Sequence, residues 1–171
     1  MHNQLWVKAS GGFTDQVNGK LLVHCFVMMF LGFFGGFAWL ISLADNVFHI
    51  LPMPRMEIPV PDQKELLRNT HTGPIMNAMY VMTVVLLSPI LKFTARQAKW
   101  VYYAAIVTLW GNALGYSAAV YAPERGLQPI GDWPNLLSYA SFYVAVVGVT
   151  AFTAICLHSA LRLARARPLA G

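Results

Sequence analysis

Four long apolar stretches, separated by polar or proline-rich connectors, dominate the chain. They cover residues 21–43, 74–91, 100–121 and 136–161. Each is close to the roughly 20 residues that a helix needs to cross the hydrocarbon core of a bilayer. Because the stretches lack a period-two alternation of apolar and polar residues, strands of a membrane barrel are not predicted. The pattern predicts an all-α integral membrane protein, a single domain built as a bundle of four transmembrane helices.

The composition supports this prediction. Of the 171 residues, 57% are hydrophobic and only 11% are charged. A soluble domain carries about 25% charged residues, so this chain lacks the charge for a fully solvated surface. A soluble enzyme, a disordered chain and a disulfide-stapled secreted module are therefore excluded.

The basic residues fall mainly on one side of the predicted bundle. The segment before residue 21, the connector 92–99 and the C-terminal tail hold eight Lys or Arg and one acid, whereas the connectors 44–73 and 122–135 hold four Lys or Arg and six acids. By the positive-inside rule, both termini are predicted to be cytoplasmic, in a bacterium at the inner membrane. The net charge of +5 is then explained by loop charge, and no nucleic-acid partner is expected.

Few polar residues lie within the four stretches, and no Asp, Glu, Lys or Arg lies deep in any of them. Proton-relay transport and ion pumping usually need such buried ionisable residues, so both are disfavoured. At the start of the second stretch, Pro74 is predicted in the first turn of a helix, with Thr72 as its cap. His71 would then lie at the outer membrane boundary, with Asn77 about 9 Å deeper.

In the third stretch, Asn112 and Tyr116 are four residues apart and share one helix face. Tyr116 and Asn77 are each a similar distance from the outer ends of their helices, so the two side chains are predicted at one depth, with His71 just above. An alternative interpretation is that these polar groups only join adjacent helices by hydrogen bonds.

Several of these residues match a known family in order and spacing. Residues 68–77 read RNTHTGPIMN and contain the pattern H-[ST]-G-P-x-x-N; Trp110, Asn112 and Tyr116 follow, and then P-x-R-G-L at residues 123–127. Over most of its length the chain resembles styrene oxide isomerase, a small membrane enzyme of bacterial styrene degradation. It departs from relatives that carry an acid two residues before the tryptophan, where this chain has Thr108, and no role is assigned to that position.

The resemblance implies isomerisation of aryl epoxides to aldehydes by a Meinwald rearrangement, for example of styrene oxide to phenylacetaldehyde. It also implies a homotrimer with haem b between neighbouring protomers. His71 would be the axial iron ligand, and Asn77 and Tyr116 would hold the epoxide oxygen over the opposite haem face. The full set of residues predicted to bind the cofactor is Arg68, His71, Trp110, Asn112 and Arg125.

The residue types are consistent with that chemistry. Ferric haem is a Lewis acid that draws electrons from the epoxide oxygen, and hydrogen-bond donors stabilise the negative charge that develops there. A 1,2-hydride shift then completes the reaction without net redox change, and an apolar pocket excludes water. Arg68 and Arg125, on the outer side, suit the haem propionates, although contact with lipid headgroups explains them equally well.

Two other function classes remain open at this stage. A b-type haem electron-transfer subunit would need a second axial histidine, and His49 is the only other histidine on the outer side. His24 and His158 lie near the cytoplasmic ends of their stretches. A non-enzymatic transporter or assembly protein would bind no haem. The sequence leaves the substrate range and the preferred enantiomer open.

Overall fold

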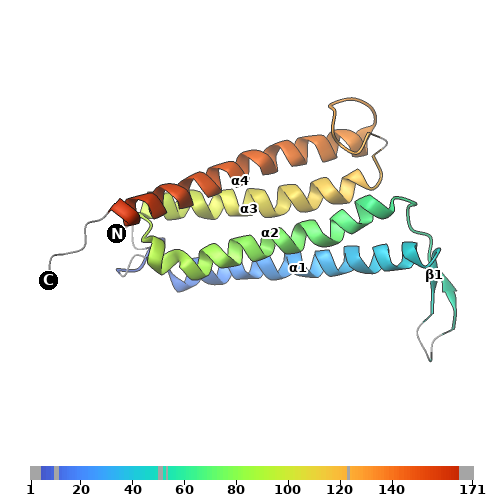
Figure 1. The fold of residues 1–171 in the computed structure, drawn as a ribbon, viewed down its shortest axis with the longest axis horizontal. Coiled ribbons are helices and arrows are strands. Elements are labelled where there is room, and N and C mark those ends of the chain that lie inside the picture. The colour runs from blue at the N-terminus through green and yellow to red at the C-terminus, as the bar shows by residue number, and fades with distance from the viewer. Residues whose placement is uncertain (1–4, 10–11, 50–51, 53, 123, 166–171) are drawn as a thin grey trace.

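The computed structural model describes residues 5–9, 12–49, 52, 54–122 and 124–165. Within them, the helices are α1 (Asp15–Leu43), α2 (Lys64–Leu91), α3 (Ala95–Ala119) and α4 (Trp133–Arg165), and a short hairpin joins β1 (Val47–Phe48) to β2 (Met56–Glu57). The helices run up and down along one long axis (Figure 1). The all-α prediction is confirmed.

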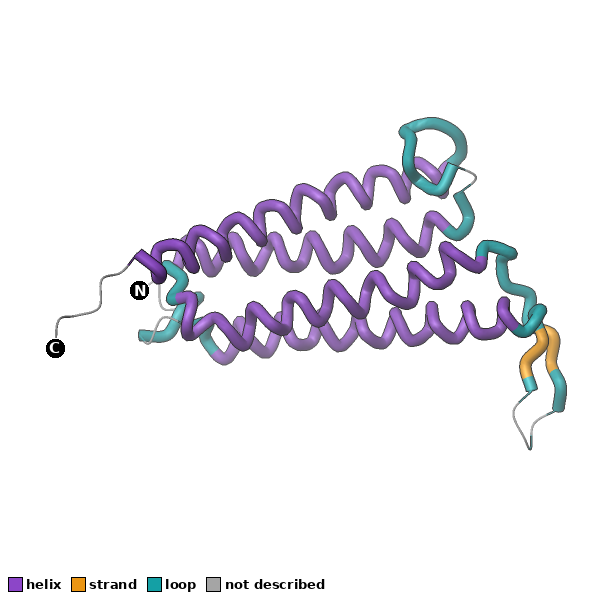
Figure 2. The backbone as a smooth tube through the Cα atoms, viewed as in Figure 1, coloured by secondary structure: helices purple, strands orange, loops and turns teal. Residues whose placement is uncertain are grey.

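The helices form two antiparallel pairs, α1 with α2 and α3 with α4, which join mainly through α2 and α3. Figure 2 shows the connections at the two ends of this bundle. One end, which we call the basic end, carries the start of α1, the α2–α3 turn and the end of α4. The other, which we call the hairpin end, carries the β-hairpin and the α3–α4 loop.

Local sequence signals fix several helix boundaries. The Thr14 side chain accepts a hydrogen bond from the Val17 amide and caps α1. Thr94 and Gln97 form a reciprocal capping box at the start of α3. Helix α2 ends at Leu91, and the residue that follows it, Lys92, reverses the chain with a positive φ of 48°.

The start of α2 differs from the sequence prediction. The helix begins at Lys64, ten residues before Pro74, so Pro74 lies inside it and Thr72 is not its cap. The Thr72 hydroxyl instead donates to the Arg68 carbonyl oxygen within the helix. A proline inside a helix removes one backbone hydrogen bond, and neighbouring helices and Ser/Thr side chains make that tolerable in a membrane. His71 therefore lies about two turns inside α2 rather than on a connector.

Three of the described helices, α1, α2 and α4, are long and apolar enough to cross a membrane. The tyrosine, tryptophan and asparagine residues of α3 lower its mean hydropathy, and many of its small residues are buried. The outward faces are apolar; α1 alone exposes Phe26, Phe30, Phe33, Phe34 and Phe37. Because soluble monomers rarely expose so much apolar surface, the molecule is built for an apolar environment.

Candidate functional site

His71 is held in a defined orientation between α2 and α1. Its Nδ1 atom lies 2.9 Å from the Gly32 carbonyl oxygen, and its ring stacks on Trp39 with centroids 6.2 Å apart. A backbone carbonyl only accepts hydrogen bonds, so Nδ1 carries the proton and the Nε2 lone pair is left available. Metal-binding histidines are commonly oriented by such a second hydrogen bond.

Glycines on α1 make room for this arrangement. A Cβ atom at Gly36 would lie 2.5 Å from His71 Nδ1, and one at Gly35 would lie 2.7 Å from the Thr70 carbonyl carbon. A side chain at either position would therefore push the imidazole or the α2 backbone away. The glycine-rich part of α1 is required for its close approach to α2.

Tyr116 lies against the opposite side of α2. Its ring occupies the space that a Cβ at Gly73 would need, and it packs edge-on against Phe142 of α4 with centroids 5.0 Å apart. Asn77 is half-buried and one turn from Gly73 on the same helix face. Asn112, also half-buried, precedes Tyr116 by one turn. The antiparallel packing of α2 and α3 thus places both asparagines on the same side of the Gly73–Tyr116 contact.

One chain alone does not bring His71 together with Asn77 and Tyr116. His71 faces α1, whereas Gly73 faces Tyr116 of α3. Two residues correspond to about 200° around a helix, so His71 and Gly73 lie on nearly opposite sides of α2. A single reacting centre that used both groups would therefore have to reach from one side of α2 to the other.

Trp110 is engaged elsewhere. Its indole Nε1 donates to His24 Nδ1 at 3.2 Å, which joins α3 to α1. The two rings meet edge-on, and Trp110 remains partly exposed. His24 is therefore an interhelical hydrogen-bond partner in the described structure.

The two arginines of the implied site lie at the hairpin end. Arg68 is exposed on α2. Arg125, in the α3–α4 loop, has a positive φ of 54°, and its guanidinium lies 3.4 Å from a Glu65 carboxylate oxygen. Pro123, which belongs to the same sequence motif, lies outside the described residues.

Sequence reasoning missed Asn135, which organises the loop that carries Arg125. This fully buried side chain accepts from the Gly126 amide at 2.8 Å and donates to the Gln128 and Ile130 carbonyl oxygens. Asp132 caps the Asn135 amide. The sequence offered one signal here, an Asp three residues before an Asn at a helix start. That pattern indicates an N-cap at Asp132, but it does not indicate that Asn135 binds the preceding loop.

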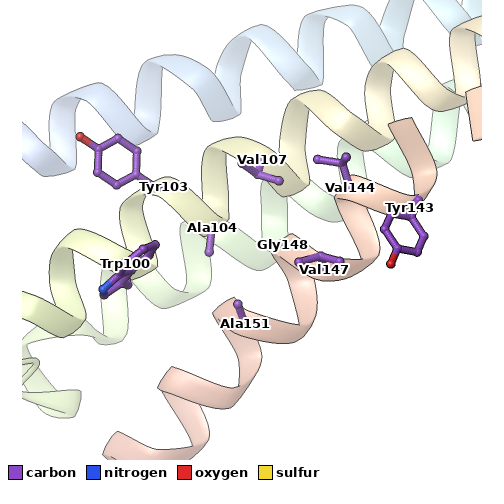
Figure 3. A pocket seen from close by; sticks show the side chains of 9 residues that line it. All are labelled: Trp100, Tyr103, Ala104, Val107, Tyr143, Val144, Val147, Gly148 and Ala151. Carbon is purple, nitrogen blue, oxygen red and sulfur yellow. The ribbon is translucent and has the colours of Figure 1, made fainter. Parts of the chain in front are cut away.

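Apolar hollows follow the α3–α4 side of the bundle. One, of about 370 Å³, lies beside Gly148 and is lined by residues that Figure 3 labels. Another, of about 380 Å³, shares Val107 and Val144 with it and reaches Trp110. Neither is lined by an Asp, Glu, Lys or Arg. Among the described residues, no group of three or more His, Cys, Asp and Glu side chains is placed to hold a metal ion.

Comparisons with known proteins agree with these features. A family model described as styrene oxide isomerase matches residues 17–161. A protein named styrene-oxide isomerase from Pseudomonas fluorescens is 29% identical over 108 residues, which is 63% of each chain. The chain thus spans less than two thirds of the length of this relative. Because the family model covers all four helices nearly completely, the chain belongs to the styrene oxide isomerase family.

Proposed function

We propose that the protein is a membrane-embedded isomerase that converts aryl epoxides such as styrene oxide to aldehydes such as phenylacetaldehyde. Family membership and the name of the Pseudomonas fluorescens relative support the reaction class. The observation that carries the proposal is the orientation of His71, whose Nδ1 is bound to a carbonyl while Nε2 is available. We further propose that α3, which lies beside the three apolar helices, is a fourth membrane span.

The side chains present fit haem b better than a metal ion bound by protein alone. A porphyrin supplies four nitrogen ligands, so a single histidine such as His71 suffices, and the described residues hold no larger cluster of metal ligands. When bound, ferric haem b supplies a Lewis acid with one coordination position open to substrate. Gly32, Gly35 and Gly36 keep the α1 surface next to His71 free of side chains.

Tyr116 and Asn77 supply the hydrogen-bond donors in this proposal. Among the described residues, neither the Tyr116 hydroxyl nor the Asn77 amide has a hydrogen-bond partner, so both are available to an epoxide oxygen. Their bonds strengthen as the C–O bond breaks and negative charge gathers on that oxygen. Positive charge develops at the benzylic carbon, and a hydride moves to it from the neighbouring carbon, which becomes the aldehyde carbon.

The apolar surroundings control the outcome of this ring opening. Water at the benzylic carbon would produce a diol, and a site without water prevents that side reaction. The hydride shift is internal to the substrate, so no external reductant and no hydrolytic base are required.

We also propose that the haem lies between protomers of a homotrimer. His71 and Gly73, which contacts Tyr116, lie on nearly opposite sides of α2. A flat group between neighbouring copies would therefore meet His71 from one copy and Asn77 with Tyr116 from the next. Arg68 and Arg125 at the hairpin end would then neutralise the propionates. For Arg125, this requires exchange of its exposed ion pair with Glu65, which costs little.

An optical spectrum of detergent-purified protein, with and without styrene oxide, tests the cofactor and its open position together. We expect a Soret band that shifts on addition of the epoxide, and phenylacetaldehyde as the product. His71→Ala should abolish both the band and the product. His158→Ala, which changes an exposed histidine near the basic end of α4, is the matched control and should retain both.

Each part of the proposal has its own contrary outcome. Product formation without a Soret band would contradict the haem assignment, while a Soret band without any product would contradict the isomerase assignment. A six-coordinate, low-spin spectrum that is lost in His49→Ala would instead identify a b-type electron carrier. His49 is exposed next to β1 in this structure.

A further inference from the structure

A hollow of about 400 Å³ lies at the basic end, away from His71 and Tyr116. It is lined by Leu5, Trp6, Gln16, Val17, Lys20, Tyr102 and Tyr103. These residues come from the first two turns of α1, from α3 and from the segment before α1. This hollow and those between α3 and α4 all have aromatic side chains in their walls, but only this one also has the ammonium of Lys20 and the amide of Gln16 in its lining.

The segment before α1 is folded against the bundle and closes one side of this hollow. Trp6 packs edge-on against Tyr102 with ring centroids 5.6 Å apart. The backbones of Val7 and Phe13 form an isolated antiparallel β-bridge. The buried Phe13 ring stacks on the Phe93 ring, with centroids 5.3 Å apart. The aromatic wall is therefore part of the packed structure.

The charge around the hollow is positive and uncompensated. Asp15, the one acid of the described basic end, is already paired with Lys8, whose Nζ lies 2.6 Å from its carboxylate. Lys20 makes no ion pair with any described residue, so its charge is available to a ligand. Further cations at this end are Lys92, Arg96, Lys99, Arg162 and Arg165. An anion is therefore the kind of ligand that would complement the positive charge around this hollow.

We propose that the hollow binds the phosphate headgroup of an anionic phospholipid. Lys20 supplies the charge, and Gln16 with the tyrosine hydroxyls supplies neutral hydrogen-bond donors. Basic pockets between transmembrane helices at the cytoplasmic side recognise such headgroups, and Trp and Tyr favour the same level of the bilayer. The acyl chains lie along the exposed apolar face of α1, which presents Val23, Phe26 and Val27 directly beyond Lys20.

Native mass spectrometry of the full chain in mild detergent tests this site. Phosphatidylglycerol is compared with phosphatidylcholine of identical acyl chains, with inorganic phosphate as a competitor. We expect wild-type protein to retain phosphatidylglycerol preferentially. Lys20→Gln should lower its retention about fivefold, since one basic side chain near anionic lipid contributes about that factor. Lys99→Gln removes an exposed charge from the same end outside the hollow and should have little effect.

Three results would overturn the proposal. Equal retention of the two lipids would show that the headgroup charge is not recognised. An equal loss in Lys20→Gln and Lys99→Gln would show general attraction to the basic end rather than a site. Displacement of the lipid by millimolar inorganic phosphate would show a site for free phosphate. Circular dichroism of both variants confirms that they are folded, so that a loss of lipid reports binding.

Discussion

At the scale of single residues, hydrogen-bond partners divide the polar side chains of the bundle into two groups. His71, His24 and Asn135 are each bound to another part of the chain. By contrast, the Tyr116 hydroxyl and the Asn77 amide have no partner among the described residues. Polar groups at membrane depth are costly unless they are satisfied, and our proposal gives these two donors the substrate oxygen as their partner.

Tyr116→Phe tests the use of one such donor. The substitution removes only the hydroxyl, while the ring contacts with Gly73 and Phe142 persist. We expect aldehyde formation from styrene oxide to slow about 100-fold, the usual effect of losing one donor to a developing oxyanion. The Soret band should be unchanged. Gas chromatography of the product and the optical spectrum measure the two effects.

Tyr80→Phe is the matched control for that variant. The Tyr80 hydroxyl bonds to Thr153 Oγ1 at 2.9 Å, so its loss removes an interhelical hydrogen bond and no proposed substrate contact. Turnover by Tyr80→Phe should stay near that of the wild type. If both variants slowed equally, the effect of Tyr116→Phe would belong to helix packing rather than to the reaction.

At the scale of elements, the α1–α2 contact depends on the absence of side chains. Gly35→Ala would place a Cβ 2.7 Å from the Thr70 carbonyl group, and the backbone of one helix must move to admit it. Overpacking of this kind costs about 1–3 kcal/mol. We expect the melting temperature of this variant, measured by circular dichroism in detergent, to be lower than that of the wild type.

Gly19→Ala provides the contrast on the same helix. A Cβ at Gly19 meets nothing within 4 Å, and alanine is favoured over glycine inside a helix by about 0.5–1 kcal/mol. Its melting temperature should rise or stay constant. A fall of the same size in both variants would argue against a specific requirement for glycine at the α1–α2 contact.

The boundaries of α2 show where sequence reasoning at this scale reaches its limit. Pro74 looked like a helix start because proline is favoured in a first turn. Within the bundle, α1 packs against residues 70–75 of α2, and that packing supports a helix through the proline. A local rule cannot weigh tertiary contacts of this kind, and so the start at Lys64 was not foreseen.

At the scale of the whole molecule, charge is divided between the two ends. The basic end carries one acid among the described residues, whereas the hairpin end carries acids that pair with Arg125 and Lys64. This asymmetry predicts the orientation of the bundle in the membrane.

Labelling with an impermeant maleimide tests that orientation. Gln128→Cys introduces a thiol at the exposed hairpin end, and Lys99→Cys introduces one at the exposed basic end. In intact cells with a permeabilised outer membrane, only Gln128→Cys should be labelled; Lys99→Cys should react after lysis. Wild-type protein, with Cys25 and Cys156 inside helices, sets the background. The reverse pattern would invert the proposed topology.

Local sequence patterns were sufficient to predict the all-α class, the order and approximate positions of the helices, the charge asymmetry and the family. These properties depend on local composition and on short motifs, which tertiary contacts do not alter. The faces that His71 and Tyr116 occupy could be established only from the three-dimensional arrangement, because they depend on how α1 and α3 pack around α2. The same is true of the roles of His24 and Asn135. The partner of His24 is on another helix, and Asn135 binds a loop that folds back onto the start of its own helix. Linear order encodes the spacing along each helix, but the rotation of one helix against another is set by side-chain packing between them.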